Sequence, residues 1–127
     1  MKRSIWVMCV ILVLMIAAWQ YQSRTLEHGC RNALLSLEEI ATEINQDRFI
    51  LANRSFSLFK ENWDKEERVL SLMISHDEID DIQIHSHCLS HANSMENKES
   101  ALYEIVQLTS TYRSLWEKFN VNFKNIL

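Results

Sequence analysis

The chain opens with an uncharged, almost wholly apolar stretch, and from there to its end apolar residues recur among polar ones at regular spacings. Residues 4–23 contain no charged side chain; Lys2 and Arg3 precede them and Arg24 follows. Twenty helical residues span about 30 Å, the thickness of the hydrocarbon core of a bilayer. The pattern therefore predicts a transmembrane helix at residues 4–23, within an N-terminal membrane anchor formed by residues 1–24.

A cleaved signal peptide is the competing interpretation of this stretch, because Ala17 and Ala18 have the small side chains that a cleavage site requires. Trp19 and Tyr21 follow at once, and such aromatic rings prefer the headgroup level of a membrane. We favour an uncleaved signal anchor. Whether the segment is cleaved stays open.

The charges on either side of the anchor predict its direction across the membrane. Lys2, Arg3 and the terminal amine lie on the short side, and Arg24 stands on the other side close to Glu27. Cationic flanks are retained in the cytoplasm. We therefore expect a single-pass protein of the cell membrane with a cytoplasmic N-terminus and an extracytoplasmic C-terminal domain, residues 25–127.

Beyond the anchor, apolar residues recur at spacings of three and four, which is typical of amphipathic helices. Asn45–Asp47, Ser75 and Asn93–Lys98 interrupt this pattern and divide it into four segments. Long stripes with short breaks predict an all-α fold, a transmembrane helix followed by an antiparallel bundle of three to four helices. The stripes are Leu26, Cys30, Ala33, Leu37, Ile40 and Ile44; Phe49, Ala52, Phe56, Phe59, Trp63, Leu70 and Met73; Ile79, Ile82, Ser86 and Leu89; and Ala101, Ile105, Leu108, Tyr112, Leu115 and Phe119.

Two local features refine this picture. Ser75-His76-Asp77-Glu78 has the form of a capping box and predicts that the third helix begins at Ser75. Glu66 falls where the second stripe requires an apolar residue. We find no internal repeat in the sequence.

The amino-acid composition restricts the fold class and the kinds of partner that the chain can bind. The 127 residues include one glycine and no proline, too few for the turns of a sheet. With Lys2 and Arg3 set aside, 11 basic and 17 acidic residues leave the outer portion with a net charge of −6. This charge argues against a nucleic-acid partner. Cys30 and Cys88 leave a disulfide possible but do not imply one.

Histidines are concentrated in the third helix and raise the question of a metal. His87 and His91 lie one helical turn apart, and Asp80 lies two turns before His87 on the same side. This spacing is compatible with zinc or copper, but a structural zinc site requires four ligands. We interpret these residues as a solvated polar face with candidate ligands, and predict no metal and no cofactor. Histidine also titrates near the pH of an outer compartment, so pH sensing is a second possibility.

No catalytic constellation emerges from the sequence. It contains no nucleophile elbow, no HExxH motif and no glycine-rich phosphate loop. We therefore expect a protein that is not an enzyme, without catalytic residues, and infer no small-molecule substrate.

The outline of the chain resembles a bacterial family of small membrane-anchored proteins, domain of unknown function 4363. The resemblance is carried by the apolar anchor, Trp63, the run His76-Asp77-Glu78-Ile79-Asp80 and the closing Phe123-Lys124-Asn125-Ile126-Leu127. It implies a bacterial, Gram-positive origin and an outward-facing helical domain, and it implies no known reaction. Capping explains Glu78 and core packing explains Ile79, so His76 and Asp80 are the candidates for a partner-binding site.

The expected function is thus non-enzymatic. The anchor places the chain in the lipid bilayer, and the outer bundle mediates protein–protein interaction, as an accessory to a membrane or envelope protein or with a second copy of the chain. The alternative is a metal- or pH-responsive sensor that uses the histidine-rich third helix.

Overall fold

The computed structural model describes residues 2–126, with side chains except those of Met73 and residues 119–126. These described residues form four helices, α1 (Lys2–Asn45), α2 (Phe49–Met73), α3 (His76–Ser94) and α4 (Lys98–Ile126). No strand occurs among the described residues, so the predicted all-α class is confirmed.

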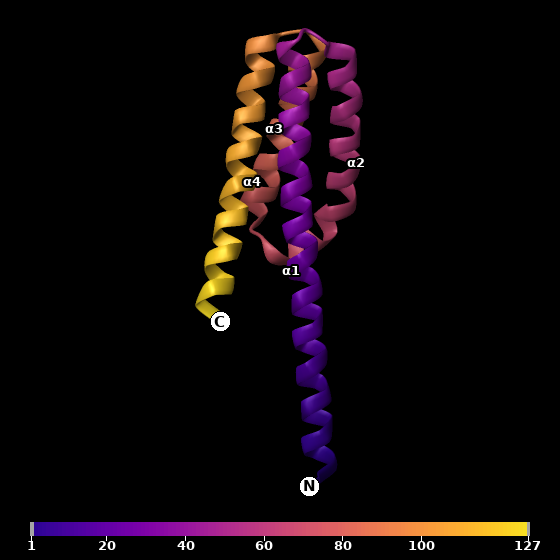
Figure 1. Ribbon diagram of the computed structural model, residues 1–127, viewed down its shortest axis with the longest axis vertical. Coiled ribbons are helices and arrows are strands. Elements are labelled where there is room, and N and C mark those ends of the chain that lie inside the picture. Colours follow the sequence, from indigo (N-terminus) through magenta and orange to yellow (C-terminus); the bar gives the residue numbers. More distant parts are fainter. Residues whose placement is uncertain (1, 127) are drawn as a thin grey trace.

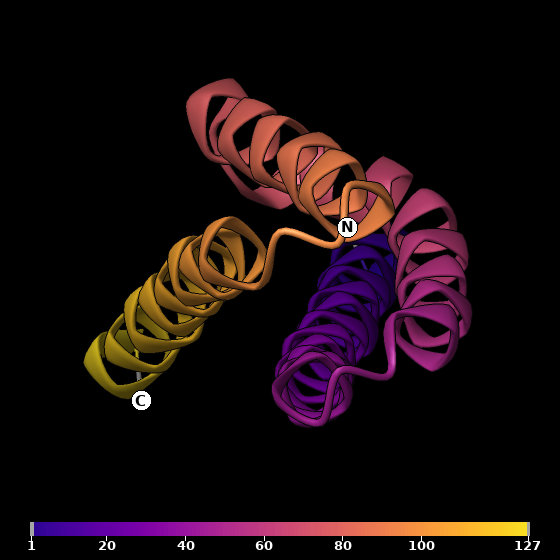
Figure 2. The ribbon, with the colours of Figure 1, turned by 90° about the horizontal axis from the view of Figure 1, so that it is seen from above.

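The helices form an up-and-down bundle with short connections. Figure 1 shows that successive helices run in opposite directions, and Figure 2 shows them arranged around one axis in chain order. Each helix packs against the one before it in the chain, and α4 closes the ring against α1. The predicted antiparallel bundle is confirmed, with the second half of α1 as its first helix.

Helix α1 continues from the apolar stretch into the bundle without a break, and its 44 residues reach about 66 Å. Its first half projects alone from the bundle (Figure 1). The most apolar part has a mean hydropathy of 2.0, and none of it is buried within the protein. The first buried side chain is Ser23, whose Oγ donates a hydrogen bond to the carbonyl of Trp19 at 2.8 Å. The projecting half is long and apolar enough to cross a membrane, a property that a signal sequence shares.

The core follows the four apolar stripes. Leu37, Ile44, Ile82 and Leu108 are completely buried. Trp63 is buried among them, and Trp116 packs at the edge of the core. The predicted core is thereby confirmed for the described side chains, with Phe49 partly buried against it, while the side chains of Met73 and Phe119 lie outside the described ones.

The two connections at the end far from the anchor have the same conformation. The amide of Arg48 donates a hydrogen bond to the carbonyl of Glu43 at 2.9 Å. In the other connection, the amide of Asn97 donates a hydrogen bond to the carbonyl of Ala92 at 2.9 Å. The residue before each amide, Asp47 or Glu96, is left-handed, with φ of 59° and 53°. Each connection is therefore a Schellman-type helix end in which an acidic residue takes the position usually held by glycine.

This shared turn marks a structural repeat that the sequence analysis missed. The hairpin of α1 and α2 and the hairpin of α3 and α4 place most of their buried residues 49 positions apart, as Ala52 and Ala101 show. The residue types differ at most of these positions, so only the spacing and the turn repeat. The two hairpins thus repeat in backbone and spacing, although the sequence has no repeat of residue types.

The start of α3 is where the capping box predicts it. Ser75 has extended backbone angles, and its Oγ accepts a hydrogen bond from the amide of Glu78 at 3.4 Å. The carboxylate of Glu78 contacts the Nζ of Lys118 in α4. The cap is thus confirmed on the serine side, while the glutamate binds a lysine of the neighbouring helix.

Replacing Ser75 by alanine removes the acceptor for this amide. We expect Ser75→Ala to lower the free energy of unfolding by about 1 kcal/mol. Chemical denaturation of the full chain in detergent micelles measures the change. Ser71→Ala is the matched control, because the Ser71 hydroxyl is exposed and bonds only to the carbonyl of Arg68 in its own helix. Equal midpoints for Ser75→Ala and the parent would show that Ser75 does not stabilise the helix start.

Candidate functional site

A carboxyl group interrupts the core in the half of the bundle nearer the anchor. Glu66 of α2 is partly buried one turn after Trp63 and one turn before Leu70, both of which are buried. Its carboxylate lies against α1 at Gly29, where an added Cβ would stand 2.6 Å from Oε2. Side chains do not approach so closely, so the only glycine of the chain provides the room for this carboxylate.

Burial raises the pKa values of Glu66 and of two neighbouring groups, the Cys30 thiol and the Tyr112 hydroxyl. Burial raises the pKa of the Glu66 carboxyl, because the charged form loses hydration. Burial, and then the charge of Glu66, raise the pKa of the Cys30 thiol in α1 to about 12. Burial, then Glu66 and Cys30, also raise the pKa of Tyr112 in α4. The neutral forms of all three groups are therefore favoured inside the bundle.

Aromatic packing fixes the position of Tyr112 opposite Glu66. The rings of Phe59 and Trp63 meet the ring of Tyr112 edge-on, with centroids 6.0 Å and 6.4 Å away. A cavity of about 10 Å³ remains between Gly29, Glu66 and these rings, close to the space that one water molecule occupies. The Glu66 carboxyl can therefore bind or release a proton at a small cavity that aromatic rings and the polar residues Asn32, Ser36 and Asn62 line.

The repeated hairpin shows which polar core residues are not demanded by the fold. The position of Glu66 corresponds to Leu115 in the second hairpin, and Ser86 and Asn93 correspond to Leu37 and Ile44 of the first. These apolar counterparts are all buried. The same place in the architecture thus accepts an apolar residue, so the fold itself does not require polarity at Glu66, Ser86 or Asn93.

Asn93 and Ser86 differ in what their polar atoms do. Asn93 Nδ2 donates to the carbonyl of Phe49 at 3.3 Å and contacts Asn53 Oδ1, which links α3 to α2 near the distal turns. The Ser86 hydroxyl is buried without a hydrogen-bond partner in the described structure. It lies beside a groove of about 290 Å³ between α2 and α3, which Lys60 and His87 also line. Asn93 therefore has a structural duty, and Ser86 has none that the contacts reveal.

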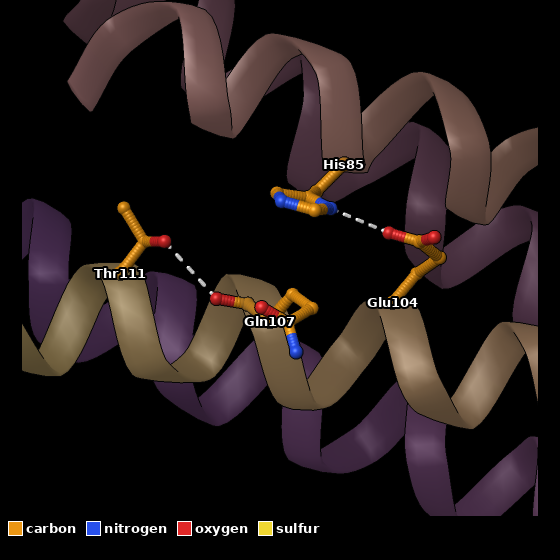
Figure 3. A network of polar contacts seen from close by, with 4 residues as sticks. All are labelled: His85, Glu104, Gln107 and Thr111. Atoms are coloured by element: carbon orange, nitrogen blue, oxygen red, sulfur yellow. Dashed lines mark hydrogen bonds and ion pairs between the residues drawn. The ribbon is translucent and has the colours of Figure 1, made fainter. Parts of the chain in front are cut away.

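A second polar contact joins α3 to α4 and was missed by the sequence analysis. His85 Nδ1 lies 2.6 Å from Glu104 Oε2, and the two side chains are 27% and 15% exposed. Figure 3 shows the two side chains pointing toward each other from α3 and α4. On α4, which carries Glu104, the Thr111 hydroxyl donates a hydrogen bond to the backbone carbonyl of Gln107 at 3.0 Å. The pair becomes an ion pair when the imidazole is protonated. The contact between His85 and Glu104 depends on the register between α3 and α4. The spacing of residues within one helix does not predict that register.

The candidates named from the sequence lie on the outside of α3. His76 and Asp80 are exposed on its first turns, near the anchor, and His87 and His91 are exposed farther along. Within the described part of the chain, no group of three or more histidine, cysteine or acidic side chains is placed to hold a metal ion. The structure does not bring His87, His91 and Asp80 together into such a group.

The cysteines are separate. Cys9, Cys30 and Cys88 are free thiols, so the disulfide that the sequence left possible between Cys30 and Cys88 does not form. Cys30 is buried and protonated at neutral pH, and Cys88 is partly exposed on α3.

We expect the Glu66 carboxyl to make stability pH-dependent. Its raised pKa in the folded chain gives a stabilisation that is fully present below the unfolded value of about 4.3 and is lost as pH rises through the folded pKa. Glu66→Gln should flatten this fall, and Glu66→Leu should raise the free energy of unfolding at neutral pH by about 1 kcal/mol through added apolar burial. Denaturation midpoints measured across a pH series test both expectations.

Glu61→Gln on the same helix is the matched control, because it removes the same charge from an exposed side chain. Identical pH profiles for Glu66→Gln and the parent would contradict the role given to the buried carboxyl.

The comparisons with known proteins agree with the resemblance seen in the sequence. Residues 20–126 match the family described as Domain of unknown function (DUF4363), which is more than half of the chain. No curated protein and no solved structure matches the chain. The matched region begins after most of the apolar stretch, so the match does not test the membrane anchor. The match does not give the source of the chain either, so the expected bacterial origin also stays a prediction.

Proposed function

We propose that this chain, which belongs to the family of domain of unknown function 4363, is a single-pass membrane protein whose helical bundle binds another protein. The bundle acts as an accessory to a larger membrane or envelope protein. Residues 4–23 of α1 lie in the bilayer, with the N-terminus in the cytoplasm and the bundle outside. The exposed apolar half of α1 and the charges of Lys2 and Arg3 support this arrangement.

The observation that carries the proposal is the exposure of the first turns of α3 at the end of the bundle nearest the anchor. His76 and Asp80 are exposed one turn apart, and Asp77 and Asp81 are exposed beside them. The connection from α2 to α3 lies where α1 leaves the bundle (Figure 1). A partner that meets this surface is therefore one that sits in the same membrane.

The charge of the surface indicates the chemistry of the partner. Glu78 is occupied by Lys118, whereas the carboxylates of Asp77 and Asp80 face solvent. They complement a basic segment close to the membrane in the partner. Exposed ion pairs contribute only about 0.2–1 kcal/mol each. Two proteins held in one membrane meet at high effective concentration, so weak contacts of this kind suffice.

The proposal involves no catalysis, cofactor or nucleic acid. A net charge of −6 outside the anchor disfavours contact with other polyanions. A second copy of the chain is the other protein that could meet this surface, and the experiment below separates it from a different partner.

A pH-responsive sensor is the second candidate function, and the contact between His85 and Glu104 favours it. At 2.6 Å the two groups link α3 to α4, and protonation of the imidazole strengthens that link. The histidine-rich helix α3 is then the responsive element.

Reversing one charge on the exposed turn of α3 tests the leading proposal. Amine-reactive or photoreactive crosslinking in intact cells, followed by mass spectrometry, should recover a membrane protein with the parent chain. Asp80→Lys should lower that yield about tenfold, because exchanging attraction for repulsion costs about 1.4 kcal/mol. Glu61→Lys, an equal charge change on the exposed face of α2, should leave the yield unchanged.

Recovery of uncrosslinked monomer alone, or equal losses in the two variants, would contradict the proposal. Crosslinks between copies of the chain would identify it as its own partner. A yield that follows pH and loses that dependence in His85→Gln would favour the sensor.

A further inference from the structure

Helix α4 continues past the anchor-proximal ends of α2 and α3. Helix α2 ends at Met73 and α3 begins at His76, whereas α4 runs on to Ile126. Lys118 contacts Glu78 in the first turn of α3, so the residues of α4 beyond Lys118 lie past the start of that helix. Figure 1 shows the yellow end of α4 extending below the connection from α2 to α3, on the side where α1 projects.

The register between α4 and α1 gives the depth that this end reaches. Tyr112 lines the same small cavity as Gly29 and Ala33, so these residues lie at one level. Ile126 is 14 residues farther along α4, or about 21 Å at 1.5 Å per residue. The same number of residues back along α1 from Gly29 and Ala33 leads to Met15 and Trp19, which belong to the exposed apolar stretch. The end of α4 therefore descends to the level of the outer part of the anchor.

The residue types at this end suit the boundary between lipid and water. Trp116, Phe119, Phe123 and Ile126 follow one another at spacings of three and four, and no acidic residue follows Glu117. The charged residues that remain are lysines, Lys118 and Lys124. Aromatic residues with lysines are the combination that favours the headgroup region of a bilayer. In a chain whose outer portion is acidic, this acid-free end stands apart.

We propose that residues 119–126 of α4 enter the outer interfacial layer of the lipid bilayer and form a second membrane attachment beside the anchor. This inference rests on the proposed insertion of residues 4–23. The bilayer is the occupant because it is the surface that α1 itself enters at this depth, and because α2 and α3 do not extend to this level. Two attachment points would fix the tilt of the bundle and hold the exposed turn of α3 at a constant height above the membrane.

Photocrosslinking to lipid tests this contact in the full chain. The chain is reconstituted into vesicles of phosphatidylcholine and phosphatidylglycerol with p-benzoylphenylalanine in place of Phe123, Val10 or Ile50. Val10 lies in the anchor, and Ile50 is 78% exposed at the distal end of the bundle. After illumination, intact-mass spectrometry reports phospholipid adducts. We expect adducts from positions 10 and 123, and at least tenfold fewer from position 50.

The three positions separate failure of this inference from failure of the anchor. Adducts at position 10 without adducts at position 123, or crosslinks from 123 to another copy of the chain, would overturn the second attachment and leave the anchor intact. Loss of adducts at position 10 would overturn the insertion on which both depend. Equal labelling at positions 50 and 123 would show contact without the proposed depth, and would also overturn the inference.

Discussion

One uninterrupted helix, α1, must satisfy two different surroundings, and the rest of the structure depends on this constraint. From Ser23 onward it supplies a stripe of buried side chains to the bundle. Before that point its side chains are exposed and apolar, with Trp6 at 74% and Leu14 at 64%. So large an apolar surface in water drives insertion into lipid or association with another protein. Because no glycine or proline interrupts the helix before Gly29, whatever holds the first half also sets the orientation of the bundle.

Within the bundle, the repeated hairpin separates what the fold requires from what it tolerates. Both hairpins use the same turn and the same spacing of buried positions, and the second puts Leu115 where the first has Glu66. A leucine at that position packs without a compensating glycine, whereas Glu66 needs Gly29 opposite it. The carboxyl thus carries a desolvation cost that the architecture does not impose. Its placement near the anchor puts the group that titrates inside the bundle close to the surface proposed to meet a partner.

The sequence predicts most of the fold because amphipathic periodicity determines which face of each helix is buried. The stripes, the breaks and the cap at Ser75 are all visible without coordinates, and the predicted core positions with described side chains are buried, except Phe49, which is partly buried. Contacts between helices are less accessible, since they depend on register. The sequence shows that Glu66 takes a position where the apolar stripe requires an apolar residue, and that the chain has a single glycine. It does not show that Glu66 and Gly29 face each other. The pairing of His85 with Glu104 gives no local signal at all.

The central claim is that α1 stays in the membrane and holds the bundle on the outer side. Ser57 is exposed on α2, so a Ser57→Cys variant carrying Cys88→Ser offers one accessible thiol in the bundle. Intact cells producing this variant are treated with a membrane-impermeant maleimide and then separated into membranes and medium. We expect labelled full-length chain in the membrane fraction without permeabilisation. Labelling only after permeabilisation, or a shortened chain free in the medium, would contradict it.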